Sequence, residues 1–169
     1  MHSPGFTKRL LVVIYDGLLF VAVAMISSAL LMAIFLFAAP NHFFVDPTLL
    51  ENPKMIELSE LGRRVGGILV TLNCLLFGFI FYGWFWTHGG QTLGMRAWNL
   101  YLTQPNGKFI GWNGAFKRYC AALLSWTAMG LGFAWILLSS QNRAWHDILS
   151  NTKIVFVPKD KQPSNITPK

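Results

Sequence analysis

Charged side chains inside long apolar stretches are the residues of this sequence best suited to chemistry. Arg9 opens a 30-residue stretch, residues 10–39, whose only charge is Asp16. Seven residues make about two turns of helix, so Arg9 and Asp16 share a face and lie about 10 Å apart along its axis. An ionised Asp at mid-membrane costs roughly 2.5–3.5 kcal/mol. We therefore expect Asp16 to face protein, where it has a basic or hydrogen-bonding partner or takes up a proton.

A second acid, Asp147, follows His146 in the segment "RAWHD" beyond the last apolar stretch. If this segment folds back on the cytoplasmic side, Asp147 can approach Arg9 or the basic end of the third helical region. The sequence thus predicts a set of ion-binding, proton-binding or charge-network residues that comes from distant parts of the chain: Arg9, Asp16, Asp147, His146, Arg96 and Asn73.

Two functions fit this set of residues, and the sequence leaves both open. In the first, Asp16 is a proton or small-cation site, Asp147 and His146 lie at its cytoplasmic mouth, and Asn73 and Thr71 add neutral oxygens. One Asp with neutral groups is a small ligand set, so such a transporter is expected to be a homo-oligomer.

In the second function, the same charges are structural. Arg9, Arg96, Asp16 and Asp147 neutralise one another and fix the packing of the helices and of a small cytoplasmic hairpin. The protein is then a membrane scaffold or accessory protein that transports nothing.

The composition indicates one membrane-embedded domain. The chain has 169 residues, of which 53% are hydrophobic and 12% charged, whereas soluble domains carry roughly 25% charged residues. Residues 10–39 and 65–86 are each long enough to span a bilayer, which needs about 20 apolar residues. A third apolar stretch, residues 115–140, contains Gly130 and Gly132 and is expected to be a broken or re-entrant helical region. Gly62 and Gly66 have the spacing that allows close helix approach.

Short strands are expected between and after the spans. The sequences "AWNLYL" and "KFIGW" flank "TQPNG", whose Pro-Asn-Gly favours a turn, so a small β-hairpin is predicted there. The sequence "TKIVFV", residues 152–157, also reads as a strand and is expected to join the hairpin. The predicted fold class is an all-α membrane protein with two full transmembrane helices, a third helical region and this hairpin.

The distribution of basic residues predicts the orientation. If the third region turns back, 11 of the 14 Lys and Arg residues fall on one side of the membrane and three on the other. If it crosses once, the split is six against eight, which gives no orientation. The positive-inside rule therefore favours a re-entrant third region, with both termini in the cytoplasm.

These motifs resemble those of the RDD family of small bacterial membrane proteins, named for one Arg and two Asp residues. "KRLLVVIYDG" supplies Arg9 and Asp16, and "RAWHDILSNTKIV" supplies Asp147. "GQTLGMRAWNLYL" resembles the family's Gly-x-Thr-x-Gly-Lys/Arg stretch. Asn151 stands where the family often has Gly, but Asn tolerates the left-handed backbone of such a turn.

The resemblance implies a multi-pass protein of the bacterial inner (plasma) membrane, with a proposed role in transport. Some members are thought to exchange cations for protons. Residues 1–157 are expected to form one RDD-like transmembrane domain, followed by a disordered cytoplasmic tail, residues 158–169.

Other classes of function lack support in the sequence. No Ser or Cys lies in a nucleophile motif, no phosphate-binding loop is present, and the four histidines are scattered without metal-ligand spacing. We therefore expect no enzyme, cofactor or metal. The net charge of +7 lies in interruptions between apolar runs, which does not indicate nucleic-acid binding. The expected partners are the lipid bilayer, a small cation or proton, and further copies of the chain.

Overall fold

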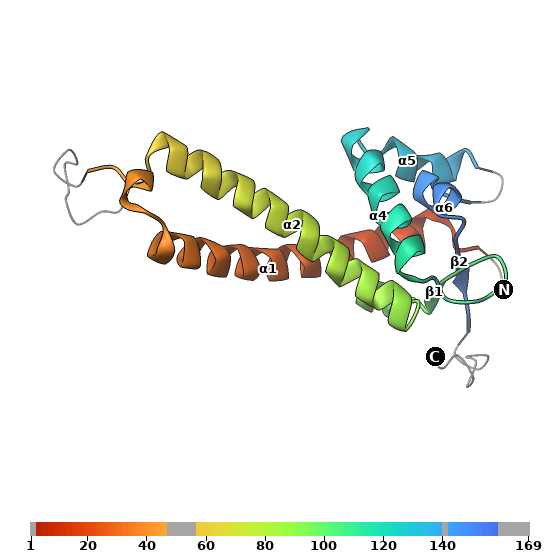
Figure 1. The fold of residues 1–169 in the computed structure, drawn as a ribbon. Coiled ribbons are helices and arrows are strands. Elements are labelled where there is room, and N and C mark those ends of the chain that lie inside the picture. The colour runs from red at the N-terminus through yellow and green to blue at the C-terminus, as the bar shows by residue number, and fades with distance from the viewer. Residues whose placement is uncertain (1–2, 47–56, 140–141, 159–169) are drawn as a thin grey trace. The chain divides into compact units, whose positions relative to one another are not determined.

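The computed structural model describes residues 3–46, 57–139 and 142–158. The chain divides into two compact units, Val21–Gly78 and a second made of Met1–Phe20 with Phe79–Lys169. Figure 1 shows the elements of both. The predicted tail lies outside the described residues, apart from Pro158, and stays a prediction.

Two long helices supply the membrane spans. α1 (Phe6–Ala38) has 33 residues and α2 (Glu60–His88) has 29. At 1.5 Å per residue they are about 50 and 44 Å long, which exceeds the hydrocarbon thickness of about 30 Å. Phe6–Ala38 and Glu60–Ala97, which joins α2 to a short following helix, are candidate spans by length and apolarity. Both predicted spans are therefore confirmed, and each helix begins before the predicted apolar run.

Within the Val21–Gly78 unit, small residues bring the chain segments together. A Cβ on Gly66 would lie 3.1 Å from Met32 Cε, and one on Gly62 would lie 2.3 Å from the Phe43 carbonyl oxygen. Phe43 belongs to the short 3₁₀ helix η1 (Asn41–Phe43) that follows α1. The predicted close approach of the two long helices is confirmed at Gly66, whereas Gly62 lies against the backbone of η1.

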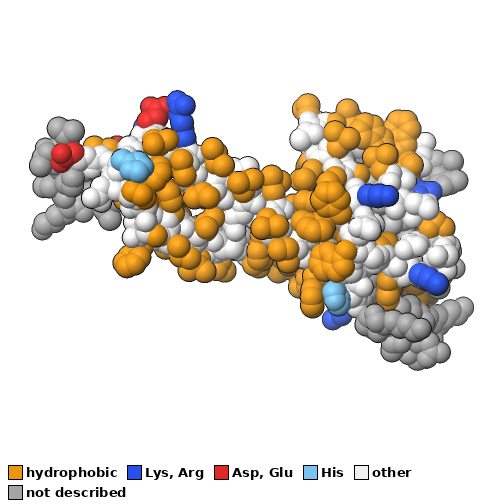
Figure 2. All heavy atoms as spheres, viewed as in Figure 1, with side chains coloured by type: hydrophobic (Ala, Val, Ile, Leu, Met, Phe, Trp, Pro, Cys, Tyr) orange, Lys and Arg blue, Asp and Glu red, His pale blue; other side chains and the backbone are white. Residues whose placement is uncertain are grey.

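The exposed surface of the long helices is apolar. Large hydrophobic side chains such as Leu18, Ile26, Leu30 and Leu76 are more than half exposed, and Figure 2 shows hydrophobic side chains across the visible face of α1 and α2. Aliphatic surface of this extent is unfavourable in water and matches a lipid environment. The predicted contact with the bilayer follows from it.

The third helical region is bent, as expected. It consists of α4 (Trp112–Thr127), α5 (Leu131–Ala134) and the 3₁₀ helix η3 (Trp135–Leu137), and the axis turns by 107° at the break. Gly130 lies at the break with φ +77°, a conformation that a side chain disfavours. A Cβ on Gly132 would come within 2.6 Å of Ser125 Oγ, so the helices meet closely beyond the bend.

The strand predicted in residues 152–157 is present and pairs with the first strand of the predicted hairpin, whereas the second strand of that hairpin is not formed. β1 (Leu100–Thr103) pairs with β2 (Lys153–Phe156), with Leu100 opposite Phe156. Residues 108–111 form no strand, although the Pro-Asn-Gly turn before them is present and Gly107 has φ +82°. The ring of Phe109 packs against Gly90 instead, where a Cβ would lie 2.5 Å away.

Two short helices complete the unit that contains the strands. They are α3 (Leu93–Ala97), before β1, and α6 (Trp145–Leu149), before β2. The hydrophobic core of this unit draws on α1, α2, α3, α4 and both strands, and its most buried members are Met95, Leu100, Leu102, Ile110 and Ala115. The first turns of α1 and the last turns of α2 are thereby fixed against the segments that carry the predicted charges.

Candidate functional site: a buried Arg/Asp network

Asp147 is the centre of a buried ion cluster. Its carboxylate forms salt bridges with Arg9 of α1 through Oδ2 and with Arg118 of α4 through Oδ1, the latter at 2.7 Å. All three side chains are at least 95% buried. Two guanidinium groups and one carboxylate leave an excess positive charge in the cluster. The expectation that Asp147 approaches Arg9 or the basic end of the third helical region is confirmed for both.

The same carboxylate fixes the start of α6. Asp147 Oδ2 accepts a hydrogen bond of 3.2 Å from the backbone N–H of Ala144, three residues earlier. An acid at this position of a helix satisfies a donor that has no partner within the helix. Asp147 therefore joins three elements, α1, α4 and α6.

Arg118 and Arg143 extend the network to the turn before β2. Arg118 Nη1 also donates to Thr152 Oγ1 at 2.7 Å. Arg143 Nη2 donates to the carbonyl oxygens of Asp147, at 3.2 Å, and of Thr152, at 3.1 Å. The turn contains Asn151 with φ +49°, so the predicted left-handed conformation at the position where the family often has Gly is present.

The electrostatics of the cluster keep Asp147 ionised and His146 neutral. Burial opposes ionisation of Asp147, but Arg118 and Arg9 outweigh it and hold the pKa of the carboxyl well below its usual range. Burial, together with Arg118 and Arg9, lowers the pKa of His146 to about 3. The His146 ring stacks on Phe133, and its Nε2 lies 3.7 Å from Asp147 Oδ1, beyond hydrogen-bond distance.

Asp16 has a different set of partners. Its Oδ2 accepts a hydrogen bond from Thr92 Oγ1 at 2.5 Å, and its Oδ1 accepts one from the backbone N–H of Gly94 at 2.7 Å. Thr92 is the residue before α3, and its Oγ1 also accepts from the N–H of Met95. The Asp16 carboxylate thus holds the first turn of α3 against α1, where donors without helical partners favour a negative charge.

Gly94 is required for this contact. A Cβ on Gly94 would lie 2.9 Å from Asp16 Oδ1 and 3.0 Å from the backbone oxygen of Val12. The Thr and second Gly of the "GQTLG" motif therefore have defined roles, since Thr92 and Gly94 are the donors to Asp16. The expectation that Asp16 faces protein and has hydrogen-bonding partners is confirmed.

The remaining predicted residues lie elsewhere. Arg96 is exposed on α3 and forms no salt bridge within the described parts of the chain. The expected network of two Arg and two Asp is therefore wrong in two members. Arg118 pairs with Asp147 in place of Arg96, and Asp16 bonds Thr92 and Gly94 instead of an Arg. Asn73 belongs to the other unit, where its Nδ2 donates to Ser27 Oγ at 3.0 Å and to Ser28 Oγ at 3.2 Å. These bonds join α1 and α2 within the span.

Arg118 and Arg143 are missing from the predicted set of site residues. The signal that could have identified Arg118 is its spacing, because it lies three residues after Ala115 and three before Ala121, on the buried face of α4. Across the residues that the structure describes, no group of three or more His, Cys, Asp or Glu side chains is placed to hold a metal ion.

Comparison with known families identifies one match for this chain. The model of the RDD family matches residues 3–151, a range that contains Arg9, Asp16 and Asp147. Comparisons with curated proteins and with solved structures found no match. Because the match covers most of the 169 residues, this chain belongs to the RDD family.

Proposed function

We propose that this protein is a non-enzymatic, non-transporting scaffold or accessory protein of the bacterial inner membrane, in which the Arg/Asp network is structural. One observation carries the proposal. Each oxygen of the Asp16 and Asp147 carboxylates accepts a hydrogen bond from a protein donor fixed by its own element. The two acids are thus occupied in joining α1 to α3, α4 and α6.

Cation binding at Asp147 is disfavoured by its surroundings. Alkali and alkaline-earth cations in proteins take several oxygen ligands, six to eight for Ca²⁺. Arg9 and Arg118 occupy the Asp147 oxygens, and their excess positive charge repels a further cation. A cation would have to displace a guanidinium group from a buried site.

Exchange of a proton or small cation at Asp16 is the second candidate, and one observation favours it. The described partners of Asp16 are neutral, the hydroxyl of Thr92 and the N–H of Gly94. Its negative charge is thus stabilised without a salt bridge among the described residues. The structural role is better supported, because both donors belong to the start of α3, which Asp16 holds against α1.

A flux measurement in vesicles tests the proposal. The purified full-length protein is reconstituted with a pH-sensitive dye inside, and sodium or potassium gradients are applied. We expect a dye response equal to that of protein-free vesicles. A sodium- or potassium-dependent pH change that Asp16→Asn abolishes, with unchanged helical circular dichroism, would overturn the proposal in favour of exchange at Asp16.

The structural role has its own readout. The Arg9→Gln and Asp147→Asn variants are compared singly and together for folded yield and thermal unfolding in detergent. If the pair is structural, each single variant loses more stability than an exposed substitution does, and the double variant loses less than the sum of both. Additive losses would count against a structural pair.

A further inference from the structure

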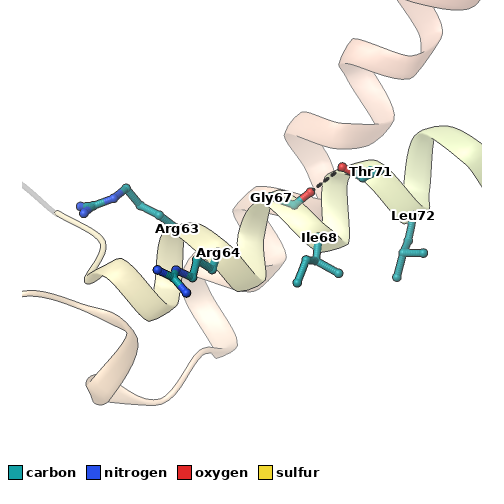
Figure 3. A pocket seen from close by; sticks show the side chains of 6 residues that line it. All are labelled: Arg63, Arg64, Gly67, Ile68, Thr71 and Leu72. Carbon is teal, nitrogen blue, oxygen red and sulfur yellow. Dashed lines mark hydrogen bonds between the residues drawn. The ribbon is translucent and has the colours of Figure 1, made fainter. Parts of the chain in front are cut away.

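An open groove lies along the exposed face of α2 in the Val21–Gly78 unit, and Figure 3 shows its lining. The lining residues form two neighbouring rows, each with a spacing of four residues. One row contains Arg63, Gly67 and Thr71, and the other contains Arg64, Ile68 and Leu72. Residues four apart stack along one face of a helix, so the rows run side by side along the axis.

The side chains of the first row project little from the surface of α2, because two of its three members, Gly67 and Thr71, are small. Gly67 has no side chain, and nothing lies within 4 Å of the point where its Cβ would be. The Thr71 hydroxyl donates to the Gly67 carbonyl oxygen at 2.8 Å, so the hydroxyl group of Thr71 already has a partner within the helix. Ile68 and Leu72, 59% and 57% exposed, form the higher second row. The groove between the rows is therefore largely apolar.

The end of the groove carries positive charge. Arg63 and Arg64 are adjacent and exposed, and the described partners of their guanidinium groups are the Leu58 carbonyl oxygen and the Glu60 carboxylate. The Arg64 side chain remains 73% exposed in its pair with Glu60. Arg63 and Arg64 thus place two exposed guanidinium groups side by side at this end of the groove.

The spacing along the helix matches the depth profile of a bilayer. Arg64 directly precedes the apolar run of the second span. At 1.5 Å per residue, Ile68 lies about 6 Å and Leu72 about 12 Å further along the axis towards the hydrocarbon. The charged end therefore lies at headgroup level, and the apolar groove extends into the region of the acyl chains.

We propose that this groove binds one anionic phospholipid. Arg63 and Arg64 contact its phosphate, and one acyl chain lies over Gly67 beside Ile68 and Leu72. Arginine pairs bind phosphate through several charge-assisted hydrogen bonds. The charge also argues against a second copy as occupant, since copies inserted in the same orientation would bring their Arg63–Arg64 pairs together.

Lipid selectivity of the full-length protein tests this assignment. The protein is reconstituted in vesicles of phosphatidylcholine, and its association with spin-labelled phosphatidylglycerol is compared with that of spin-labelled phosphatidylcholine. We expect at least a threefold preference for phosphatidylglycerol. The double variant Arg63→Gln/Arg64→Gln should lose this preference, and Gly67→Leu should reduce it at least twofold by filling the groove.

Matched variants distinguish lipid binding in the groove from effects of total positive charge and of folding on lipid selectivity. Lys108→Gln/Lys117→Gln removes two exposed positive charges elsewhere and should keep the preference. Equal association of both lipids with the unmodified protein, or a preference that survives both groove variants, would overturn the proposal. So would a dimer, seen by light scattering, that Gly67→Leu dissociates while lipid selectivity stays unchanged, because a second copy would then be the occupant.

Discussion

At the scale of single residues, the Asp147 carboxylate and the Arg9 and Arg118 guanidinium groups depend on one another. A buried ion pair adds little net stability compared with a well-packed apolar alternative, because each charge loses its hydration. Removal of one partner is costly, since the other charges stay buried without compensation. The excess positive charge makes Asp147 the member whose loss has the largest effect.

The substitution Asp147→Asn is therefore expected to lower the free energy of unfolding by roughly 3–5 kcal/mol, because two buried guanidinium groups lose their counter-charge. Thermal unfolding followed by circular dichroism in detergent measures the effect. Glu60→Gln serves as the matched control, since it breaks the exposed pair with Arg64 and should cost roughly 0–1 kcal/mol. Equal losses in the two variants would contradict the prediction.

Gly94→Ala tests the contact between Asp16 and α3. The added methyl would lie 2.9 Å from Asp16 Oδ1 and 3.0 Å from the Val12 backbone oxygen, so α3 must move from α1. We expect a destabilisation of roughly 1–3 kcal/mol, the usual cost of overpacking, measured by the same unfolding assay. Gly17→Ala is the control, because nothing lies within 4 Å of its Cβ position. Its unfolding temperature should not fall.

At the scale of elements, α6 carries a pH-sensitive group. His146 has an ordinary pKa of 6.5 when unfolded and a pKa of about 3 in the folded protein, mainly through burial. As the pH falls, His146 therefore takes up a proton in the unfolded chain at a higher pH than in the folded protein. The contribution of neutral His146 to stability is fully present above pH 6.5 and is lost progressively as the pH falls towards 3.

We therefore expect the unfolding temperature to fall between about pH 7 and about pH 4.5, and His146→Gln to flatten this dependence. Asp147 adds its own loss only below its unfolded pKa of 3.8, outside this interval. Unfolding scans at several pH values in one detergent check the expectation. Parallel curves for the variant and the unmodified protein would show that His146 titrates in the folded state as it does in the unfolded one.

Most of the helices and strands could be predicted from the sequence, and the elements that could not be predicted have physical explanations. Apolar run length predicts α1 and α2, and Gly130 predicts the bend after α4. The Pro-Asn-Gly turn suggested a hairpin, but Phe109 packs on Gly90 and the chain then enters α4. The partner of β1 is β2, which the Arg118–Thr152 bond helps to place. The sequence "TKIVFV" predicts that this strand exists and joins the sheet, whereas local turn chemistry alone predicts the wrong partner for β1.

The sequence indicates which charged residues belong to the candidate site, but it shows only in part which of them bond one another. An acid in a lipid-spanning run must face protein, which identifies Asp16 without a structure. Arg96 and Arg118 both lie near membrane boundaries, and only the rotation of α3 and α4 about their axes decides which of them is buried. That rotation depends on tertiary packing, which one sequence does not encode in an obvious pattern.

At the scale of the whole molecule, the contacts constrain the topology. Arg9 bonds Asp147, and β1 pairs with β2, so the start of α1, the segment after α2 and the segment around β2 lie together within one unit. This agrees with the split of 11 basic residues against three in favour of a turned-back third region.

Reporter fusions test this topology. A fluorescent protein fused after Lys169 should fluoresce and alkaline phosphatase at the same site should be inactive, which indicates a cytoplasmic C-terminus. Alkaline phosphatase inserted between α1 and α2 should be active. An active phosphatase after Lys169 would contradict the turned-back third region and the shared side of both termini.

The Arg9–Asp147 bond also sets an order for biogenesis. The two residues are separated by 138 positions, and ribosomes add roughly 5–20 residues per second. Arg9 is therefore synthesised roughly 7 to 28 seconds before its counter-ion. During that interval the Arg9 guanidinium lacks its counter-ion, so the buried cluster can form only after codon 147 has been translated.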